Sequence, residues 1–229
     1  MRRRVLLACL VMLIALASAP GQARAMGSAG DPLEAVNRAV FDFNQLVAKP
    51  VRRVSAKIER TVDPAVIQAL RDFLSNIAEP GVALSYLAQG ELSQTRVALK
   101  RLLINSVEGP LGFRDVAAAE GLTQRPANLT NVLCHYGVPP GPFVMLPFYG
   151  GMTLRDLVAQ MATISAGYVA FGEIYLGYRI ASLSLGALDG ADNFRQVQFL
   201  DNGRPDPYAA TRAWQRMTAH ELCEAPDAN

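Results

Sequence analysis

The chain has 229 residues, of which 51% are hydrophobic and 18% are charged, and its formal net charge is +2. Residues 1–25 carry four arginines and no acid, so the rest of the chain has a net charge of −2. Because that remainder has no basic run, the sequence argues against nucleic acid as a partner and does not indicate polybasic attraction to anionic lipid. Its 204 residues can bury one large core, and we expect one domain.

The first 25 residues have the pattern of a bacterial export signal. Arg2 to Arg4 form a basic start, Val5 to Ala19 an apolar run, and Ala23-Arg24-Ala25 a cleavage site. The apolar run is shorter than the ~20 residues that a membrane-spanning helix needs. Leu6-Leu7-Ala8-Cys9 also matches a short lipobox, but most of the apolar run follows Cys9. We therefore predict cleavage after Ala25 rather than acylation of Cys9.

The first predicted helix begins at Asp31-Pro32-Leu33-Glu34, where Asp31 can cap free amides and Pro32 fits the first helical position. We expect this helix to end at Lys49-Pro50. An apolar row runs along it at spacings of three and four, and comprises Leu33, Val36, Val40, Phe43 and Val47. Three polar residues lie off this row: Asn37, Arg38 and Asn44.

Further helices are predicted from similar start and stop signals. The predicted segments are, in order, a helix from Asp63-Pro64 to a break at Glu79-Pro80, a helix over Val82 to Ala88, a helix over Leu92 to about Val107, and a Gly/Pro turn over Glu108 to Asp115. On the helix that begins at Leu92 we expect Arg96, Lys100 and Arg101 to face outward. Because no segment alternates with period two over a useful length, we expect no substantial sheet and assign the fold to the all-α class.

A long apolar segment, Leu157 to Leu188, follows in the second half of the chain. Its first 16 residues carry no charge, which is too short a window for a membrane span. It is either the buried central helix of a soluble bundle or an interfacial helix. Beyond it we expect helical pieces between residues 193 and 220. The expected domain organisation is a cleaved signal over residues 1–25, one helical domain over residues 26–220 and a flexible tail over residues 221–229.

The loop from Gly137 to Gly151 has the side chains of a core. It holds four prolines, four glycines and several large apolar residues, with no charge. Loops normally hydrogen-bond to water. Prolines remove amide donors and restrict the chain, so we predict a stiff loop that faces lipid or packs against the helices.

Two cysteines, Cys134 and Cys223, lie outside the export signal in a compartment that permits disulfides. They can form a bridge or remain free thiols, because pairing cannot be read from sequence. A metal site that combines them with His135 and His220 is disfavoured, because adjacent Cys and His ligands are awkward to place around one ion. We expect no metal and no cofactor.

Catalytic motifs are missing from the sequence. There is no G-x-S-x-G elbow and no phosphate-binding G-x-x-x-x-G-K-[ST] loop. The run "HELCE" from His220 has Glu224 where a zinc protease helix needs its second histidine. These absences argue against an enzyme.

Three blocks of sequence resemble the MlaA/VacJ family of outer-membrane phospholipid-transport proteins. They are "DPLEAVNRAVFDFN" from Asp31, "NSVEGPLGFRDVA" from Asn105, and "HYGVPPGPFVMLPFYGGMTLRD" from His135. The matching positions are Asp31, Pro32, Asn37, Arg38, Phe43 and Asn44 in the first block, Asn105, Gly109, Gly112 and Asp115 in the second, and Tyr136, Gly137, Gly141, Pro142, Pro147, Arg155 and Asp156 in the third.

The resemblance implies a ring-like bundle of amphipathic helices at the periplasmic face of the outer membrane, in its inner leaflet. It implies a passive conduit that removes misplaced phospholipid from the outer leaflet. It also implies two partners, a trimeric porin and a soluble periplasmic lipid carrier, which passes lipid to an inner-membrane ATP-driven complex. Family members commonly carry an acylated cysteine just before the first block, where this chain has Ala25-Met26, so attachment would rest on apolar helices.

A phospholipid headgroup that crosses hydrocarbon without polar partners costs several kcal/mol, which a polar lining would lower. Asn37, Arg38, Phe43 and Asn44 are our candidates for this lining, and the alternative is that the polar residues among them face solvent. We expect Arg155 and Asp156 to cap the following helix rather than touch lipid. The competing functions are a periplasmic scaffold without lipid passage and an envelope hydrolase that uses His135.

Overall fold

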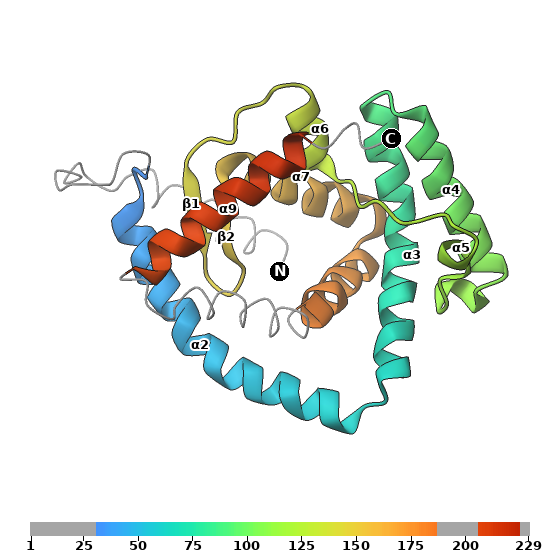
Figure 1. Cartoon of the computed structure of the whole chain (residues 1–229), viewed down its shortest axis with the longest axis horizontal. Coiled ribbons are helices and arrows are strands. Elements are labelled where there is room, and N and C mark those ends of the chain that lie inside the picture. Colours follow the sequence, from blue (N-terminus) through green and yellow to red (C-terminus); the bar gives the residue numbers. More distant parts are fainter. Residues whose placement is uncertain (1–30, 187–205, 225–229) are drawn as a thin grey trace.

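The computed structural model describes residues 31–186 and 206–224, and its helices follow a ring-like outline (Figure 1). Two long helices, α2 (Glu34–Thr61) and α3 (Pro64–Ala88), meet at a corner and form two sides of it. The other elements are α4 (Leu92–Val107), η1 (Pro110–Gly112), α5 (Val116–Ala119), α6 (Leu129–His135), β1 (Phe143–Leu146), β2 (Gly150–Thr153), α7 (Leu154–Phe171), a helix over residues 173–186, and α9 (Pro207–Glu224). The all-α class is confirmed.

Both prolines that were expected to end helices lie inside them. Pro50 is within α2 and Pro80 within α3, so two predicted breaks are wrong, and the segment predicted as a separate third helix is the end of α3. An interior proline costs about 3 kcal/mol through its lost hydrogen bond and its clash with the preceding turn. Both prolines are exposed, and long helical segments continue on each side of them. The start of α3 follows the prediction, because the Asp63 side chain accepts a hydrogen bond from the Ala65 amide at 2.8 Å.

The charge-free loop contains a β-hairpin that sequence reasoning missed. Antiparallel pairing places Phe143 opposite Thr153 and Leu146 opposite Gly150. Strands of four residues are too short to give a clear period-two signal. Gly151 is required here, because a Cβ at this position would collide with the Phe143 ring. The loop is therefore packed in its strands, while its tip exposes Phe148 at a positive φ of 63°.

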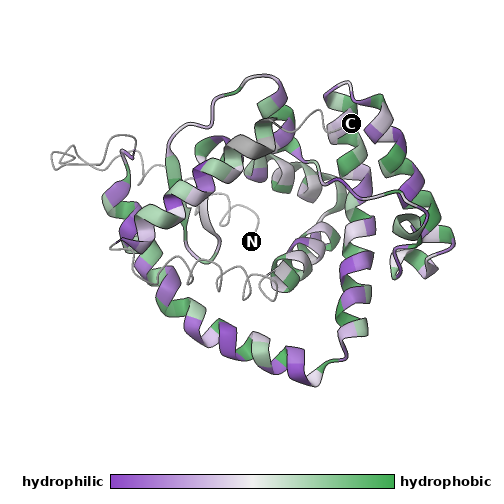
Figure 2. Cartoon of the chain, viewed as in Figure 1, coloured by the Kyte–Doolittle hydropathy of each residue, from purple (hydrophilic) through white to green (hydrophobic). Residues whose placement is uncertain are grey.

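Among the described residues, buried apolar side chains form two small clusters. One contains Phe41, Phe143, Met145 and Tyr208, and the other contains Val82, Ala83, Ala98 and Ala127. Figure 2 shows hydrophobic and hydrophilic residues alternating along α2, α3 and α4. Many apolar side chains on these helices are exposed: Val36, Phe43, Leu46, Val51, Val54, Val66, Leu70, Ile77, Leu84, Leu92, Leu99, Leu103 and Val107.

The apolar segment that begins near Leu157 is two helices rather than one. Gly172, with φ at 62°, ends α7, and the chain turns back into residues 173–186. The two helices pack closely, because Gly167 lies against the Tyr175 ring and Arg179 donates a hydrogen bond to Gln160 at 3.1 Å. Across the described ranges, the longest apolar stretch of any helix falls short of what a membrane crossing requires.

Helix α9 extends to Glu224, four residues into the segment expected to be a tail. Its end is fixed to α6 by a disulfide between Cys134 and Cys223, whose Cα atoms are 5.3 Å apart. Of the two states that the sequence left open, the structure therefore has the bridged one. Residues 1–30 and 225–229, on which the export signal and the rest of the tail were predicted, lie outside the described residues.

Candidate functional site

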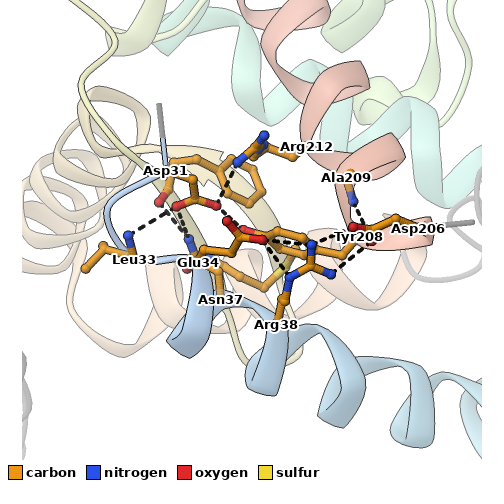
Figure 3. A network of polar contacts seen from close by, with 11 residues as sticks. Asp31, Leu33, Glu34, Asn37, Arg38, Asp206, Tyr208, Ala209 and Arg212 are labelled. Carbon is orange, nitrogen blue, oxygen red and sulfur yellow. Dashed lines mark hydrogen bonds and ion pairs between the residues drawn. The ribbon is translucent and has the colours of Figure 1, made fainter. Parts of the chain in front are cut away.

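Asp31 begins a polar cluster that joins both ends of the described chain (Figure 3). Its carboxylate is buried and accepts hydrogen bonds from the Leu33 amide and the Asn37 Nδ2, each at 3.2 Å. The other oxygen accepts a hydrogen bond from the Tyr208 hydroxyl and pairs with Arg212 at 3.2 Å. Burial raises the pKa of Tyr208, and its hydrogen bond to Asp31 raises it further. Asp31 therefore connects the start of α2 to α9.

Arg38 makes the second contact between α2 and α9. Its guanidinium donates to both carboxylate oxygens of Asp206, at 2.9 and 2.5 Å, and to Glu34 at 2.8 Å. It also lies 4.5 Å from the centre of the Tyr208 ring. The hydrogen bond from Arg38 lowers the pKa of Asp206 to about 2. This paired geometry holds a carboxylate in one orientation, which a single point charge would not do.

Asn37 and Asn44, two helical turns apart on α2, hold the hairpin by its backbone. The Asn37 amide donates to the Phe143 carbonyl at 3.0 Å and accepts from the Met145 N–H at 2.9 Å. The Asn44 amide repeats this with the Leu146 carbonyl at 2.9 Å and the Phe148 N–H at 2.8 Å. Each asparagine takes the place of a neighbouring strand, so the free edge of β1 is satisfied by side chains. The side-chain amides of Asn37 and Asn44, which we expected to line a passage, are therefore hydrogen-bonded to the backbone of the hairpin.

Phe43, the fourth residue proposed for the lining, is 41% exposed. It packs edge-on against Phe148, with ring centres 5.2 Å apart. It also borders an open apolar groove of about 560 Å³ whose other lining residues are Ala35, Val36, Ala39, Val40 and Pro147. The structure therefore separates the four candidates, because three form hydrogen bonds within the protein and Phe43 makes only apolar contacts among those described.

The second sequence block builds a buried ionic cluster around Arg101. This side chain, expected to face outward, is 1% exposed, so that prediction is wrong. Its guanidinium donates to Glu79 at 2.7 Å, to Asp115 at 2.9 Å and to the carbonyl of Leu122. Arg101 shares a face of α4 with Ala98 and Asn105, while Leu99 and Leu103 occupy the opposite face. That spacing was the available signal, and it was overlooked because apolar residues were assumed to point inward.

The two carboxylates around Arg101 have different electrostatic environments. Burial raises the pKa of Glu79, and the hydrogen bond from Arg101 only partly offsets it. Burial also acts to raise the pKa of Asp115, but hydrogen bonds from Arg101 and Asn105 outweigh it and lower that pKa. Asp115 additionally caps α5 by accepting from the Ala118 amide at 3.1 Å.

The glycines of the second block are required by close packing. A Cβ at Gly109 would overlap the carbonyl oxygens of Arg114 and Asn105. Gly112 has φ at 92°, and a Cβ there would collide with the Asn76 side chain. Asn105 in turn donates to Asp115 at 3.0 Å and accepts from the Ala117 amide at 2.9 Å. The block is a folded turn that supports the ionic cluster.

The third block fixes the approach to the hairpin and the start of α7. The Tyr136 hydroxyl donates to the Ala88 carbonyl at 2.7 Å, and Gly137 and Gly141 both have positive φ. Arg155 is buried and donates to the Val138 carbonyl at 3.1 Å, and its amide donates to the Pro140 carbonyl. Asp156 forms a capping box with Thr153. The carbonyl of Pro142 accepts a hydrogen bond from the Leu154 amide.

A second groove, of about 380 Å³, lies between α3, the loop before α6 and residues 178–186. Its walls mix both kinds of side chain: polar Arg71, Ser75, Gln124, Tyr178 and Ser182, and apolar Leu74, Ala78, Val82 and Leu185. Such a surface suits an amphiphile better than a fully polar or fully apolar ligand. None of the four predicted lining residues contributes to it. No group of three metal-ligating side chains occurs in the part of the chain that the structure describes.

The described part of the chain is a helical protein with exposed apolar rows and buried ionic side chains. The chain belongs to the family described as "MlaA lipoprotein", which it matches over residues 29–219.

Several relatives carry a functional name. The chain is 41% identical over 137 residues to the "Intermembrane phospholipid transport system lipoprotein MlaA" of Escherichia coli (strain K12), a match that spans 58% of this chain and 55% of that protein. The protein of the same name from Haemophilus influenzae is 28% identical over 219 residues, with 93% and 87% covered.

A solved structure has the same fold. It is described as "Structural basis for maintenance of bacterial outer membrane lipid asymmetry", and it matches with a TM-score of 0.72 and 27% identity. The match covers 85% of this chain and 99% of the solved one.

Proposed function

We propose that the protein is a passive conduit at the periplasmic face of the outer membrane. In this role it removes mislocalised phospholipid from the outer leaflet and delivers it to a soluble periplasmic carrier, which maintains lipid asymmetry. The names of the matched relatives support transport of phospholipid between membranes. The resemblance of the chain to their family further suggests a trimeric porin as a partner. No step of this role requires a cofactor or a catalytic base.

The observation that carries the proposal is the inverted distribution of side chains. Leu99, Leu103 and Val107 are exposed on α4, while Arg101 and Asn105 are buried on the same helix. In water, each Å² of apolar surface that stays exposed forgoes about 25 cal/mol of the free energy that burial would contribute to stability. In a bilayer the same rows face hydrocarbon, and the polar groups are satisfied internally, as hydrocarbon requires.

The passage itself is best placed at the mixed groove between α3 and residues 178–186. Polar side chains such as Gln124 and Ser182 can replace water around a headgroup, while Leu74 and Leu185 contact acyl chains. Asn37, Arg38 and Asn44 then act on passage by holding the hairpin and α9 in place, and Phe43 acts by packing against the tip of the hairpin. This assigns the four residues a positioning role.

A strain that lacks the protein tests the function. We expect more phosphatidylethanolamine in its outer leaflet than in the parent, measured by an amine-reactive reagent that does not enter intact cells. The wild-type chain should restore the parental level. A variant with Asn37→Ala should restore it less well at equal protein abundance, because the hairpin loses two hydrogen bonds. An unchanged outer leaflet in the deletion strain would rule out the proposed role.

A further inference from the structure

The second half of α2 presents a surface that its first half does not. The hairpin is held by Asn37 and Asn44 in the first half. Beyond Pro50, α2 continues along the outside of the ring to its corner with α3 (Figure 1). Residues 49–61 contain five cations and one acid. This half of the helix is therefore the most strongly basic part of the described chain.

Two separate rows of side chains run along this half of the helix. One row is apolar and consists of Val47, Val51, Val54 and Ile58. The other is basic and consists of Lys49, Arg53, Lys57 and Arg60, all of them exposed. Residues three and four apart share a face of a helix, so each row is continuous. At 3.6 residues per turn the two rows lie roughly 130° apart around the helix axis.

The four cations are available for a partner outside the chain. No ion pair to Lys49, Arg53, Lys57 or Arg60 occurs within residues 31–186 and 206–224. This basic row is hard to recognise in the sequence, because apolar and small residues separate the cations and no continuous basic run results. Folding into a helix brings the cations into line on one face.

We propose that this basic row binds the anionic headgroups of a phospholipid membrane while the neighbouring valine row enters the boundary of its acyl chains. The proposal builds on the membrane location given above and adds a preference for anionic lipid. Val54 is 60% exposed, and an acidic protein surface would give it no apolar contact. An amphipathic helix with cations beside an exposed apolar row has the pattern of an interfacial helix.

Flotation of the full chain with lipid vesicles tests the basic row. Vesicles of phosphatidylcholine alone are compared with vesicles in which about a third of the lipid is phosphatidylglycerol. Each cation near an anionic surface contributes about fivefold to binding at low salt. We therefore expect at least roughly tenfold stronger binding to the anionic vesicles, and this advantage should fall to about twofold near 1 M salt, where screening acts over about 3 Å.

Substitutions in the basic row test whether it causes the preference for anionic vesicles. Replacing Arg53 and Lys57 by glutamine should weaken the preference for anionic vesicles by roughly twentyfold at low salt, or abolish a smaller one, because two of the four cations are lost. The exchanged pair, Arg53→Lys with Lys57→Arg, keeps the charge and should keep the preference. Binding to the neutral vesicles, which depends on the apolar rows, is the internal reference for a folded protein.

The outcomes separate this inference from the proposed function. Equal binding to both vesicle types, or an anionic preference that the glutamine pair leaves undiminished, would show that the basic row does not bind anionic headgroups, and would leave the proposed membrane location intact. Absence of binding to either vesicle type would overturn both. A preference that is reduced in the glutamine pair and retained in the exchanged pair supports the inference.

Discussion

Arg101 shows how a single side chain can hold a buried site together. It is almost completely buried and faces Glu79 and Asp115. The lowered pKa of Asp115 means that its contribution to stability is present above its usual pKa and is lost as the pH falls. The raised pKa of Glu79 acts in the opposite direction, because its contribution is present below its usual value and is lost as the pH rises through the folded value. These effects partly cancel, so substitution tests the cluster better than pH.

Replacing Arg101 by methionine should strongly destabilise the protein. The change leaves the buried Glu79 carboxylate and the partly buried Asp115 carboxylate without their cation, and breaking a buried ion pair in this way costs about 3 to 5 kcal/mol. The measurement is the free energy of unfolding from denaturant titration of the purified chain. Arg96→Met is the matched control on the exposed side of α4, and it should change stability by less than about 0.5 kcal/mol. Equal effects of the two changes would show that the Arg101 cluster contributes little.

At the scale of elements, α9 is fastened at both of its ends. Its start is held to α2 by the Arg38 to Asp206 ion pair and by the Tyr208 contact to Asp31. Its end is held to α6 by the disulfide. With the pKa of Asp206 lowered from 3.8 to about 2, the contribution of the ion pair is present above the ordinary value and disappears as the pH falls through 2. At neutral pH both fastenings therefore act together.

Removing the disulfide should loosen the C-terminal end of α9 more than its start. The bridge joins residues 89 positions apart, and closing a loop of that length stabilises a protein by about 4.6 kcal/mol in the chain-entropy account. The double variant Cys134→Ser with Cys223→Ser should lose stability of this order and exchange its amides faster in α6 and the last turns of α9. Hydrogen exchange measured by mass spectrometry reports both.

Asp206→Asn is the comparison for the opposite end of α9. It should speed exchange near residues 206–210 and leave the amides around Cys223 protected. If the serine variant instead left α9 fully protected, the noncovalent contacts alone would be sufficient to fasten the helix.

At the scale of the whole molecule, the sequence predicted the helices better than it predicted which side of each helix is buried. The start of α3 and both ends of α4 follow local rules, because capping and propensity act within a few residues. The spacing places Arg101 on one face with Ala98 and Asn105, but it does not say which face of α4 is buried, since that depends on whether the outside of the ring is water or lipid. The Arg38 to Asp206 contact spans 168 positions and carries no local signal. The hairpin was missed because its strands are short and its edge is paired with side chains of α2.

Placing a charge on an exposed apolar row of α4 tests whether that row faces lipid. Leu103 is 63% exposed, so Leu103→Asp should leave the fold intact as judged by circular dichroism. In a protein surrounded by water this change would be neutral or would improve solubility. In contact with hydrocarbon, an aspartate costs roughly 2.5 to 3.5 kcal/mol, which predicts at least about tenfold weaker partition into phosphatidylcholine vesicles. Ser93→Asp adds the same charge to an exposed polar position on the same helix and should bind as the wild type does. Equal partition of the two variants would show that the row containing Leu103 lies outside the membrane.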